Sequence, residues 1–165
     1  MQKIIIGCSL LLGASSFAVS VEEATALFSQ RTNSKEGVSK ALAAADMVKE
    51  LAKTASSTEE KALLKLKESE YVYFIGNRVD GKDKILDTFE RGYDAADFAI
   101  KNLTGSKKSE ALYWYAANQG RWGETKGVLA SLGRWSSEMK PALEQAISLD
   151  KTVHSYGPLR VAGKA

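Results

Sequence analysis

The stretch ALAAADMVKELA, residues 41–52, carries its apolar residues at steps of three and four. That spacing places them on one face of an α-helix, whereas a half-buried strand would alternate every second residue. The positions on this face are Ala41, Leu42, Ala45, Val48, Leu51 and Ala52. The stretch therefore predicts an amphipathic helix, and helical periods are found from Val21 onward.

Signals for helix ends divide the next part of the chain. Ser-Thr-Glu-Glu at 57–60 has the form of a capping box, which predicts a helix start. The apolar run 71–75 by itself fits a strand, but no turn separates it from the helical pattern before it. Asp80-Gly81 predicts the following break. A further helix is expected through 85–100, with Gly105 as its left-handed cap.

Two more helices are expected after this cap. The first begins at Ser106 or Ser109, and the second is capped by Ser136, carries Pro141 in its first turns and ends near Asp150. Glycines are expected to interrupt or break the helical pattern between these points: Gly120, Gly123, Gly127 and Gly133. The chain has only 2 prolines and no Asn-Gly or Gly-Gly turn, so the pattern predicts an all-α fold.

Composition limits the class of protein. With 165 residues, 44% of them hydrophobic, the chain is long enough for one domain with a core. A net charge of +3 lacks the basic excess that is typical of nucleic-acid binding. The single cysteine excludes a disulfide framework, and the single histidine leaves any metal site to carboxylates. Phosphate-binding glycine motifs and nucleophile motifs are missing, so we expect no metal, no cofactor and no enzyme.

The first twenty residues are typical of a secretory signal peptide. Residues 4–19 are apolar or small, carry no charge and are too few to span a bilayer comfortably. Ser-Phe-Ala at 16–18 has the small residues of a cleavage site. Ile-Ile-Gly-Cys at 5–8 resembles a lipoprotein box that would acylate Cys8, but the apolar run before this cysteine is short. We therefore expect a periplasmic or secreted protein, with residues 21–165 as one helical domain.

A short pattern recurs along the chain. Residues 72–76, 111–115 and 159–163 each contain an apolar residue, a second one three positions later and a small residue after it, and the middle copy is imperfect. Small or apolar residues follow the first two copies at helical steps: Gly92, Ala96 and Ala99, then Met139, Leu143 and Ala146. This arrangement resembles the tetratricopeptide pattern, in which antiparallel helix pairs stack into an α-solenoid. Lys151 stands where those repeats usually have a proline, so the repeats are degenerate.

The last copy leaves the repeat open. Residues 157–163 have the pattern of a new first helix, with Gly163 as its packing glycine, and no second helix follows. A repeat array needs a closing unit to cover its last apolar face. Either the chain is therefore a fragment of a longer protein, which we favour, or a partner covers this end. We expect residues 21–165 alone to associate or aggregate, which leaves the oligomeric state open.

One part of the chain is more particular than a generic repeat. EALYWYAANQGRWG at 110–123, with LGRW at 132–135 and YGPLRVAG at 156–163, resembles the T component of tripartite ATP-independent periplasmic (TRAP) transporters. The motifs cover residues 110–163, and residues 21–104 share only the helical pattern. The resemblance implies a secreted, all-helical accessory protein that meets a periplasmic solute-binding protein and offers a pocket to a small apolar or amphipathic ligand. The alternative is a generic periplasmic scaffold for protein–protein interaction.

The candidate binding residues lie in the same segment. Four of them follow at steps of four, three and one and are expected on one stripe of a helix: Trp114, Asn118, Arg121 and Trp122. An amide and a guanidinium between two indoles suit a planar or anionic group, whereas the alternative places both indoles in the core. Arg134 and Trp135 either bind or cap helix carbonyls. Arg160 either binds a carboxylate ligand or pairs with Asp150 or Glu144.

Two arrangements bear on catalysis. His154 has no nucleophile or orienting carboxylate near it in the sequence, so we expect a surface or loop histidine. Glu110 and Glu124 form a glycan-cleaving pair only if the fold brings their carboxylates together. Two acidic residues do not make a motif, and we favour a binding protein.

Overall fold

The computed structural model describes residues 20–163, apart from the side chains at 128, 130 and 131. All regular elements within these residues are helices, which confirms the all-α prediction. The expected signal peptide, with its cleavage site and Cys8, lies outside the described residues except for Ser20. Among the residues that the structure describes, no helix is both long and apolar enough to cross a membrane.

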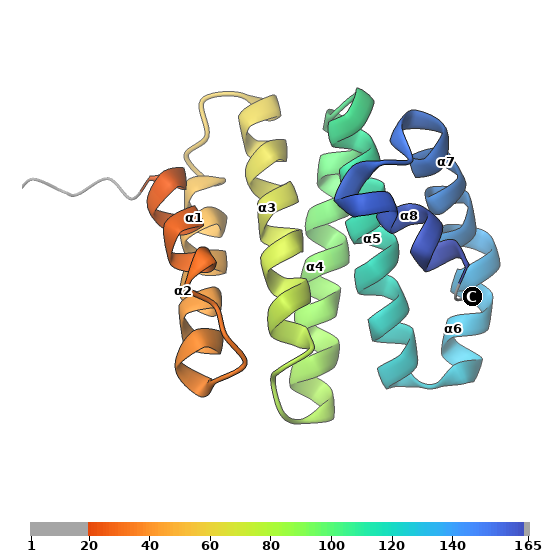
Figure 1. Ribbon diagram of the computed structural model, residues 1–165, viewed down its shortest axis with the longest axis horizontal. Helices are drawn as coiled ribbons and strands as arrows, with labels where there is room; N and C mark the ends of the chain where they lie inside the picture. Colours follow the sequence, from red (N-terminus) through yellow and green to blue (C-terminus); the bar gives the residue numbers. More distant parts are fainter. Residues whose placement is uncertain (1–19, 164–165) are drawn as a thin grey trace, which may run out of the picture.

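The helices follow one another with short connections (Figure 1). Their bounds are α1 Val21–Ser29, α2 Lys35–Leu51, α3 Thr58–Gly76, α4 Lys82–Asn102, α5 Gly105–Lys126, α6 Val128–Arg134, the π-helical turn η1 Trp135–Met139, α7 Lys140–Asp150 and α8 Val153–Ala162. The η1 turn continues directly from α6 into α7. The run 71–75 lies inside α3, so its assignment to a helix rather than a strand is confirmed.

Neighbouring helices pack as pairs, α1 with α2, α3 with α4, and α5 with the continuous segment of α6, η1 and α7. The pairs stand side by side in Figure 1, and α3 also packs against α2 and α5. Helix α8 crosses in front of α5 and α7 and contacts both. These packed helix pairs agree with the predicted all-α helical-repeat fold.

Small residues let the helices approach closely. Ala41, Ala44 and Ala45 of α2 are fully buried. A Cβ atom on Gly76 would lie 2.7 Å from the ring of Phe89, so the backbone of α3 lies directly on that ring. The small and apolar residues expected in the second helices of the repeats, at positions 92, 96, 99, 139, 143 and 146, are all buried. Burial of this apolar surface is the main force that holds the pairs together.

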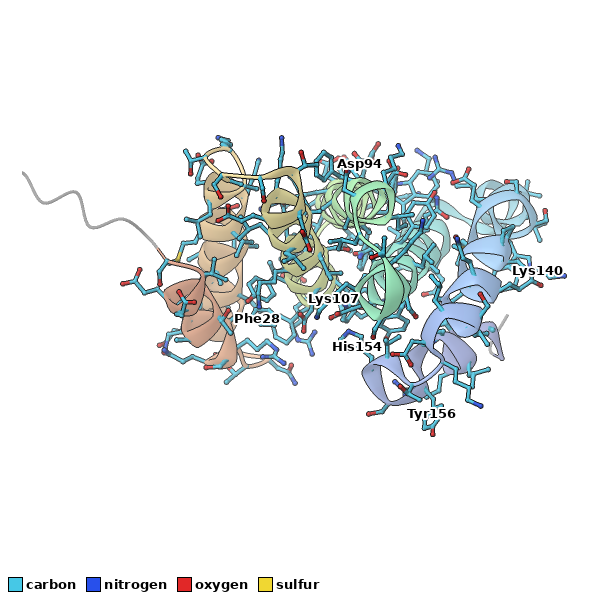
Figure 2. The ribbon with its side chains drawn as sticks, turned by 90° about the horizontal axis from the view of Figure 1, so that it is seen from above. Phe28, Asp94, Lys107, Lys140, His154 and Tyr156 are labelled. Atoms are coloured by element: carbon cyan, nitrogen blue, oxygen red, sulfur yellow. The ribbon has the colours of Figure 1, made fainter. Side chains whose placement is uncertain are left out.

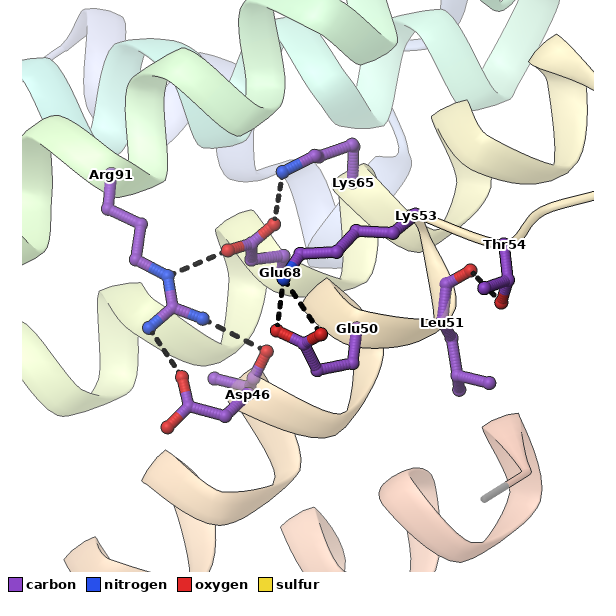
Figure 3. A network of polar contacts seen from close by, with 9 residues as sticks. Asp46, Glu50, Leu51, Lys53, Thr54, Lys65, Glu68 and Arg91 are labelled. Carbon is purple, nitrogen blue, oxygen red and sulfur yellow. Dashed lines mark hydrogen bonds and ion pairs between the residues drawn. The ribbon is translucent and has the colours of Figure 1, made fainter. Parts of the chain in front are cut away.

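A buried carboxylate joins α2, α3 and α4 (Figure 3). Glu68 of α3 is 1% exposed, and its two oxygens accept hydrogen bonds from Arg91 Nε and Lys65 Nζ, each at 2.7 Å. Arg91, on α4, also donates to Asp46 at 2.9 Å and to the carbonyl of Ala45 at 3.0 Å, both on α2. A charge this deeply buried is tolerated only when it is paired and hydrogen-bonded, as it is here.

Several expected helix boundaries are confirmed. The Ser57 hydroxyl accepts from the Glu60 amide at 3.0 Å, although the Glu60 carboxylate bonds to Ser56 and so does not close the capping box. Gly81 breaks the chain before α4 with a φ of +95°, a conformation that costs glycine least. Gly127, with a φ of +123°, ends α5 as expected.

Other boundaries differ from the expectation. Helix α5 continues through Gly120 and Gly123, and Gly133 lies inside α6, because tertiary packing outweighs the low helix propensity of glycine. Ser109 is buried in α5, where its hydroxyl donates to carbonyls of α7, so it does not start the helix. Ser136 lies within η1 and caps nothing. Leu42 and Leu63, expected on apolar faces, are 44% and 37% exposed.

Candidate functional site

A groove of about 620 Å³ lies where α3, α5, α6, η1 and the end of α8 meet. Its lining comes from Tyr73, Asn77, Ala116, Ala117, Gly120, Arg121, Glu124, Leu132, Trp135, Met139 and Val161. The small residues belong to α5, and larger apolar side chains come from α6, η1 and α8. A Cβ on Gly120 would lie 3.1 Å from the Met139 methyl group, so this glycine keeps the groove open beside η1.

The groove has one charged pair in its lining. Arg121 donates to the Glu124 carboxylate one turn along α5, and its guanidinium lies 6.0 Å from the centre of the Phe89 ring. The Nε atom of Arg121 is buried and has no hydrogen-bond partner among the described residues. One N–H therefore remains unpaired beside an otherwise mostly apolar surface, which is a common design for small-molecule sites.

The predicted stripe on α5 does not form one surface. Trp114 is 8% exposed and packs against Tyr73 at 5.3 Å between ring centres. Asn118 is fully buried and donates to Ser69 and to the Trp114 carbonyl. Trp122 lies elsewhere on α5, because eight residues turn a helix by about 80° beyond two full turns. Of the four stripe residues, only Arg121 lines the groove.

Trp122, Arg134 and Trp135 divide between two surfaces. The Arg134 guanidinium lies 4.2 Å from the centre of the Trp122 ring, which in turn meets Tyr93 edge-on. This is a cation–π contact between α6 and α5, and no bond from Arg134 to a helix carbonyl is found among the described residues. Trp135 belongs to the groove lining with Arg121. Two of the seven predicted binding residues thus meet in one hollow.

Arg160 stabilises an unusual turn at the start of α8. His154, Ser155 and Tyr156 have φ angles of 49°, 54° and 63°, the left-handed region that non-glycine residues rarely adopt. Arg160 Nη2 donates to the His154 carbonyl at 2.9 Å, and Nη1 donates to the Ser155 carbonyl. The expected ion pair of Arg160 with Asp150 or Glu144 is therefore wrong, since none is found among the described residues.

The turn seats α8 on α5. A Cβ on Gly157 would lie 2.7 Å from the Tyr113 ring, so Gly157, rather than the exposed Gly163, is the packing glycine of this segment. Pro158 next to it is also buried. Residues 157–162 thus pack against α5 and α7, while Leu159 of this segment remains 42% exposed.

The prediction of a surface or loop residue holds for the backbone of His154, which lies in this non-helical turn, whereas its side chain is half-buried. Its Nε2 atom lies 3.1 Å from Oε1 of Glu110, and its ring stacks on Tyr113 at 5.1 Å and meets Trp114 edge-on at 4.7 Å. Figure 2 shows Lys107 and His154 close together, on the side of the molecule away from Asp94. No local pattern marks this contact, because 44 residues separate Glu110 from His154.

Two carboxyl groups near this histidine have opposite pKa shifts. Burial raises the pKa of Glu70, and the charge of Glu110 raises it further, although His154 lowers it. Burial also acts to raise the pKa of Glu110, but hydrogen bonds from His154 and Lys107 outweigh it and leave that pKa below its usual value.

A second hollow, which sequence analysis missed, adjoins the groove. It has a volume of about 460 Å³ and is lined by Asn33, Tyr73, Asn77 and Arg78. Tyr73 and Asn77 line both hollows, so the two are neighbours on the same face of α3. No local motif marks Arg78, because it follows α3 as an ordinary loop residue and meets Asn33 only in the folded chain.

The pair of Glu110 and Glu124 gains no support from the geometry. Glu110 and Glu124 lie fourteen residues apart on one straight helix, or about 21 Å at 1.5 Å per residue, which is too far for a glycosidase pair. Among residues 20–163, no group of three histidine, cysteine or acidic side chains is placed to hold a metal ion. No protein-family model matches the chain, and a search of the curated proteins finds no match either.

Proposed function

We propose that the chain is an exported helical-repeat binding protein, similar to the T accessory component of TRAP-type solute uptake. The observation that carries the proposal is the groove of about 620 Å³ between α3, α5, η1 and α8. Its volume is in the usual range for small-molecule sites, and its lining is mostly apolar. A small apolar or amphipathic ligand fits such a surface, and packed helix pairs are the architecture that the resemblance implies.

Two leucines of α6 make a matched test of the groove. Leu132 is 59% exposed and lines the groove, whereas Leu129 is 89% exposed and does not. Trp135 in the lining provides a fluorescence signal for titration with dodecanol. We expect Leu132→Gln to weaken dodecanol binding several-fold, since it places an amide in the apolar lining, and Leu129→Gln to leave it unchanged. Equal effects of the two variants, or no binding by the wild type, would contradict the ligand site.

A periplasmic solute-binding protein is the partner that the resemblance implies. The genes beside this one provide the test, because a TRAP system encodes a solute-binding protein and a membrane permease together. If such a gene is found, its product should co-purify with this protein when the two are co-expressed. A gene neighbourhood with neither component would count against uptake and favour the alternative below.

The alternative is a periplasmic scaffold for protein–protein interaction. Leu129 supports it, since Leu129 and Leu132 expose two apolar side chains three residues apart on α6, a surface suited to contact with another protein. The same two variants separate the functions. A scaffold requires that Leu129→Gln abolishes capture of the partner protein while dodecanol binding persists, whereas a ligand-carrying component depends on Leu132.

Export is part of the proposal. The apolar run 4–19 supports a signal peptide, and Ser20 begins the first helix of the folded domain directly after it. Expression with the full leader in a Gram-negative host, followed by intact mass measurement of the periplasmic fraction, should give a chain that starts between Val19 and Val21. A diacylglyceryl mass on Cys8 would instead show a membrane-anchored lipoprotein.

A further inference from the structure

The second hollow differs from the groove in its chemistry. Its lining consists of two amides, a phenol ring and a guanidinium, from Asn33, Asn77, Tyr73 and Arg78. It lies between the loop after α1 and the end of α3, and it meets the groove at Tyr73 and Asn77. One continuous surface therefore changes from mostly apolar to polar along its length.

Arg78 is held rigidly in this hollow. Its guanidinium lies 3.7 Å from the centre of the Phe74 ring. Its Nε donates to Asn33 Oδ1 at 2.8 Å, and its Nη1 donates to the Phe74 carbonyl at 2.9 Å. A guanidinium has five N–H groups, and these bonds occupy two of them. The bond to the Phe74 carbonyl caps the carboxyl end of α3. The other N–H groups of this planar guanidinium remain available as donors.

A second arginine stands at the same ring. The Arg31 guanidinium lies 4.1 Å from the Phe28 ring centre and 5.7 Å from that of Phe74, and its Nη1 donates to the Phe28 carbonyl at 3.1 Å. Both guanidinium groups are thus fixed against aromatic rings within reach of Phe74. Stacking of this kind orders the side chain without using its in-plane donors.

Neither arginine has a carboxylate partner. Among residues 20–163, no carboxylate oxygen lies within 4.0 Å of Arg31 or Arg78, although Arg91 and Arg121 both have one. Glu70 lies one turn before Phe74. Burial raises the pKa of Glu70 and the charge of Arg31 lowers it by a smaller amount, but Glu70 and Arg31 form no ion pair. Arg78 in the lining of the second hollow, and Arg31 near the same Phe74 ring, are thus two positive groups that lack a counter-charge and are suited to an anionic partner.

We propose that Arg31 and Arg78 bind the oxyanion head group of an amphipathic ligand, such as an alkyl carboxylate or alkyl phosphate, whose chain lies in the adjoining groove. This inference rests on the proposed function, since it names the class of ligand that the groove takes. The head group accepts hydrogen bonds from the free guanidinium donors and from the amides of Asn33 and Asn77. The chain passes Tyr73 toward Trp135 and Met139.

The test compares three amphiphiles of equal chain length: dodecanoate, dodecyl phosphate and dodecanol. The two acids are titrated into the mature protein below their critical micelle concentrations and dodecanol below its solubility limit, with tryptophan fluorescence and calorimetry as readouts. We expect the wild type to bind one or both acids about ten-fold or more tightly than the alcohol, because only the acids form charge-assisted hydrogen bonds. The better of the two acids identifies the head group.

The double variant Arg31→Gln/Arg78→Gln assigns the preference to these residues. It should bind the acids no better than it binds dodecanol. The matched control Lys140→Gln/Lys151→Gln removes two exposed positive charges from α7 and its end, and it should keep the preference. Circular dichroism checks that each variant is folded. The ratio of the affinities of the wild type for the acids and for dodecanol tests the proposal even if a variant fails to fold.

The outcomes separate this inference from the proposed function. If the wild type binds dodecanol and the acids equally, or the double variant keeps the preference for acids, the head-group site is wrong and the groove remains. If the wild type binds none of the three amphiphiles, the groove is not an amphiphile site and the proposed ligand function fails as well.

Discussion

Two carboxylates, one in each half of the chain, join helices in different ways. Glu68 is 1% exposed and is held by Arg91 and Lys65. Glu110, whose side chain is 19% exposed, is held by His154 and Lys107 at the seat of α8. The first contact joins three helices inside the N-terminal half, and the second fastens one short helix to α5.

The two contacts differ in how pH acts on them. The contact of Glu68 pairs both oxygens of its carboxylate with cationic side chains. The contact of Glu110 includes a histidine and adjoins Glu70, whose pKa is shifted the other way. We therefore expect pH to change the stability of the contact between α8 and α5, which lies next to the groove.

The largest expected loss of stability comes from a residue that contacts helices of both regions. Trp114 is 8% exposed and packs between Tyr73 of α3 and His154 of α8. Trp114→Ala should lower the free energy of unfolding by ~3–5 kcal/mol, the usual loss for a buried large aromatic side chain. Urea denaturation measures it, with Trp122→Ala, a half-buried indole, as the milder control. An unchanged melting temperature with lost ligand binding would move Trp114 from the core to the site.

A second variant acts on the N-terminal contact alone. Arg91→Met leaves the buried Glu68 with Lys65 as its one charged partner, and it should cost about 3 kcal/mol of unfolding free energy. The exposed pair of Lys101 and Asp97 provides the control, since Lys101→Met should cost less than about 0.5 kcal/mol. The comparison would fail if the two variants proved equally stable.

At the C-terminal contact, substitution of two glutamates should change the stability in opposite directions. Glu110→Gln removes an acceptor of charge-assisted bonds and should cost about 1 kcal/mol at neutral pH. Glu70→Gln should stabilise the protein there, because it removes a charge that burial disfavours. The charged and titratable groups that act on these two carboxyls are His154, Lys107, Lys67 and Arg31.

The pH dependence of the stability changes in Glu110→Gln and Glu70→Gln tests this prediction. The folded pKa of Glu70 is raised, so the gain in Glu70→Gln should fade as pH falls through a value above the usual glutamate pKa. The folded pKa of Glu110 is lowered, so its stabilisation is present above the usual pKa and is lost only below it. Thermal melts from pH 7 to pH 3 follow both, and differences of the same sign would refute the assignment.

The smallest expected effect lies at the other end of the chain. The Ser20 hydroxyl accepts from the Glu23 amide at 3.1 Å, and the Glu23 carboxylate accepts from the Ser20 amide at 3.0 Å. Ser20→Ala should cost about 0.5–1 kcal/mol and fray α1 first. Ser29→Ala, which removes a hydroxyl bonded inside the same helix, is the control. Hydrogen exchange on residues 21–24 detects the loss.

The candidate site was only partly predictable. Arg121 and Trp135 were singled out as binding residues, and both line the groove. Helical spacing places Trp122 on one stripe with Arg121, and Arg134 precedes Trp135 in the sequence, but Trp122 and Arg134 pack on each other at another face of α5. Spacing along a helix gives the direction of a side chain, and it does not say which neighbour will cover that direction.

The sequence by itself determined the helical class, several helix boundaries and the small residues through which the helices pack. These features depend on local properties: the apolar period, capping side chains and glycine conformations, which act within a few residues. Only the tertiary structure decided the contact of Glu68 with Arg91, the left-handed turn at 154–156 and the two adjoining hollows. Each of these joins residues more than twenty positions apart or depends on such a contact, so its stability comes from burial and pairing that no local pattern records.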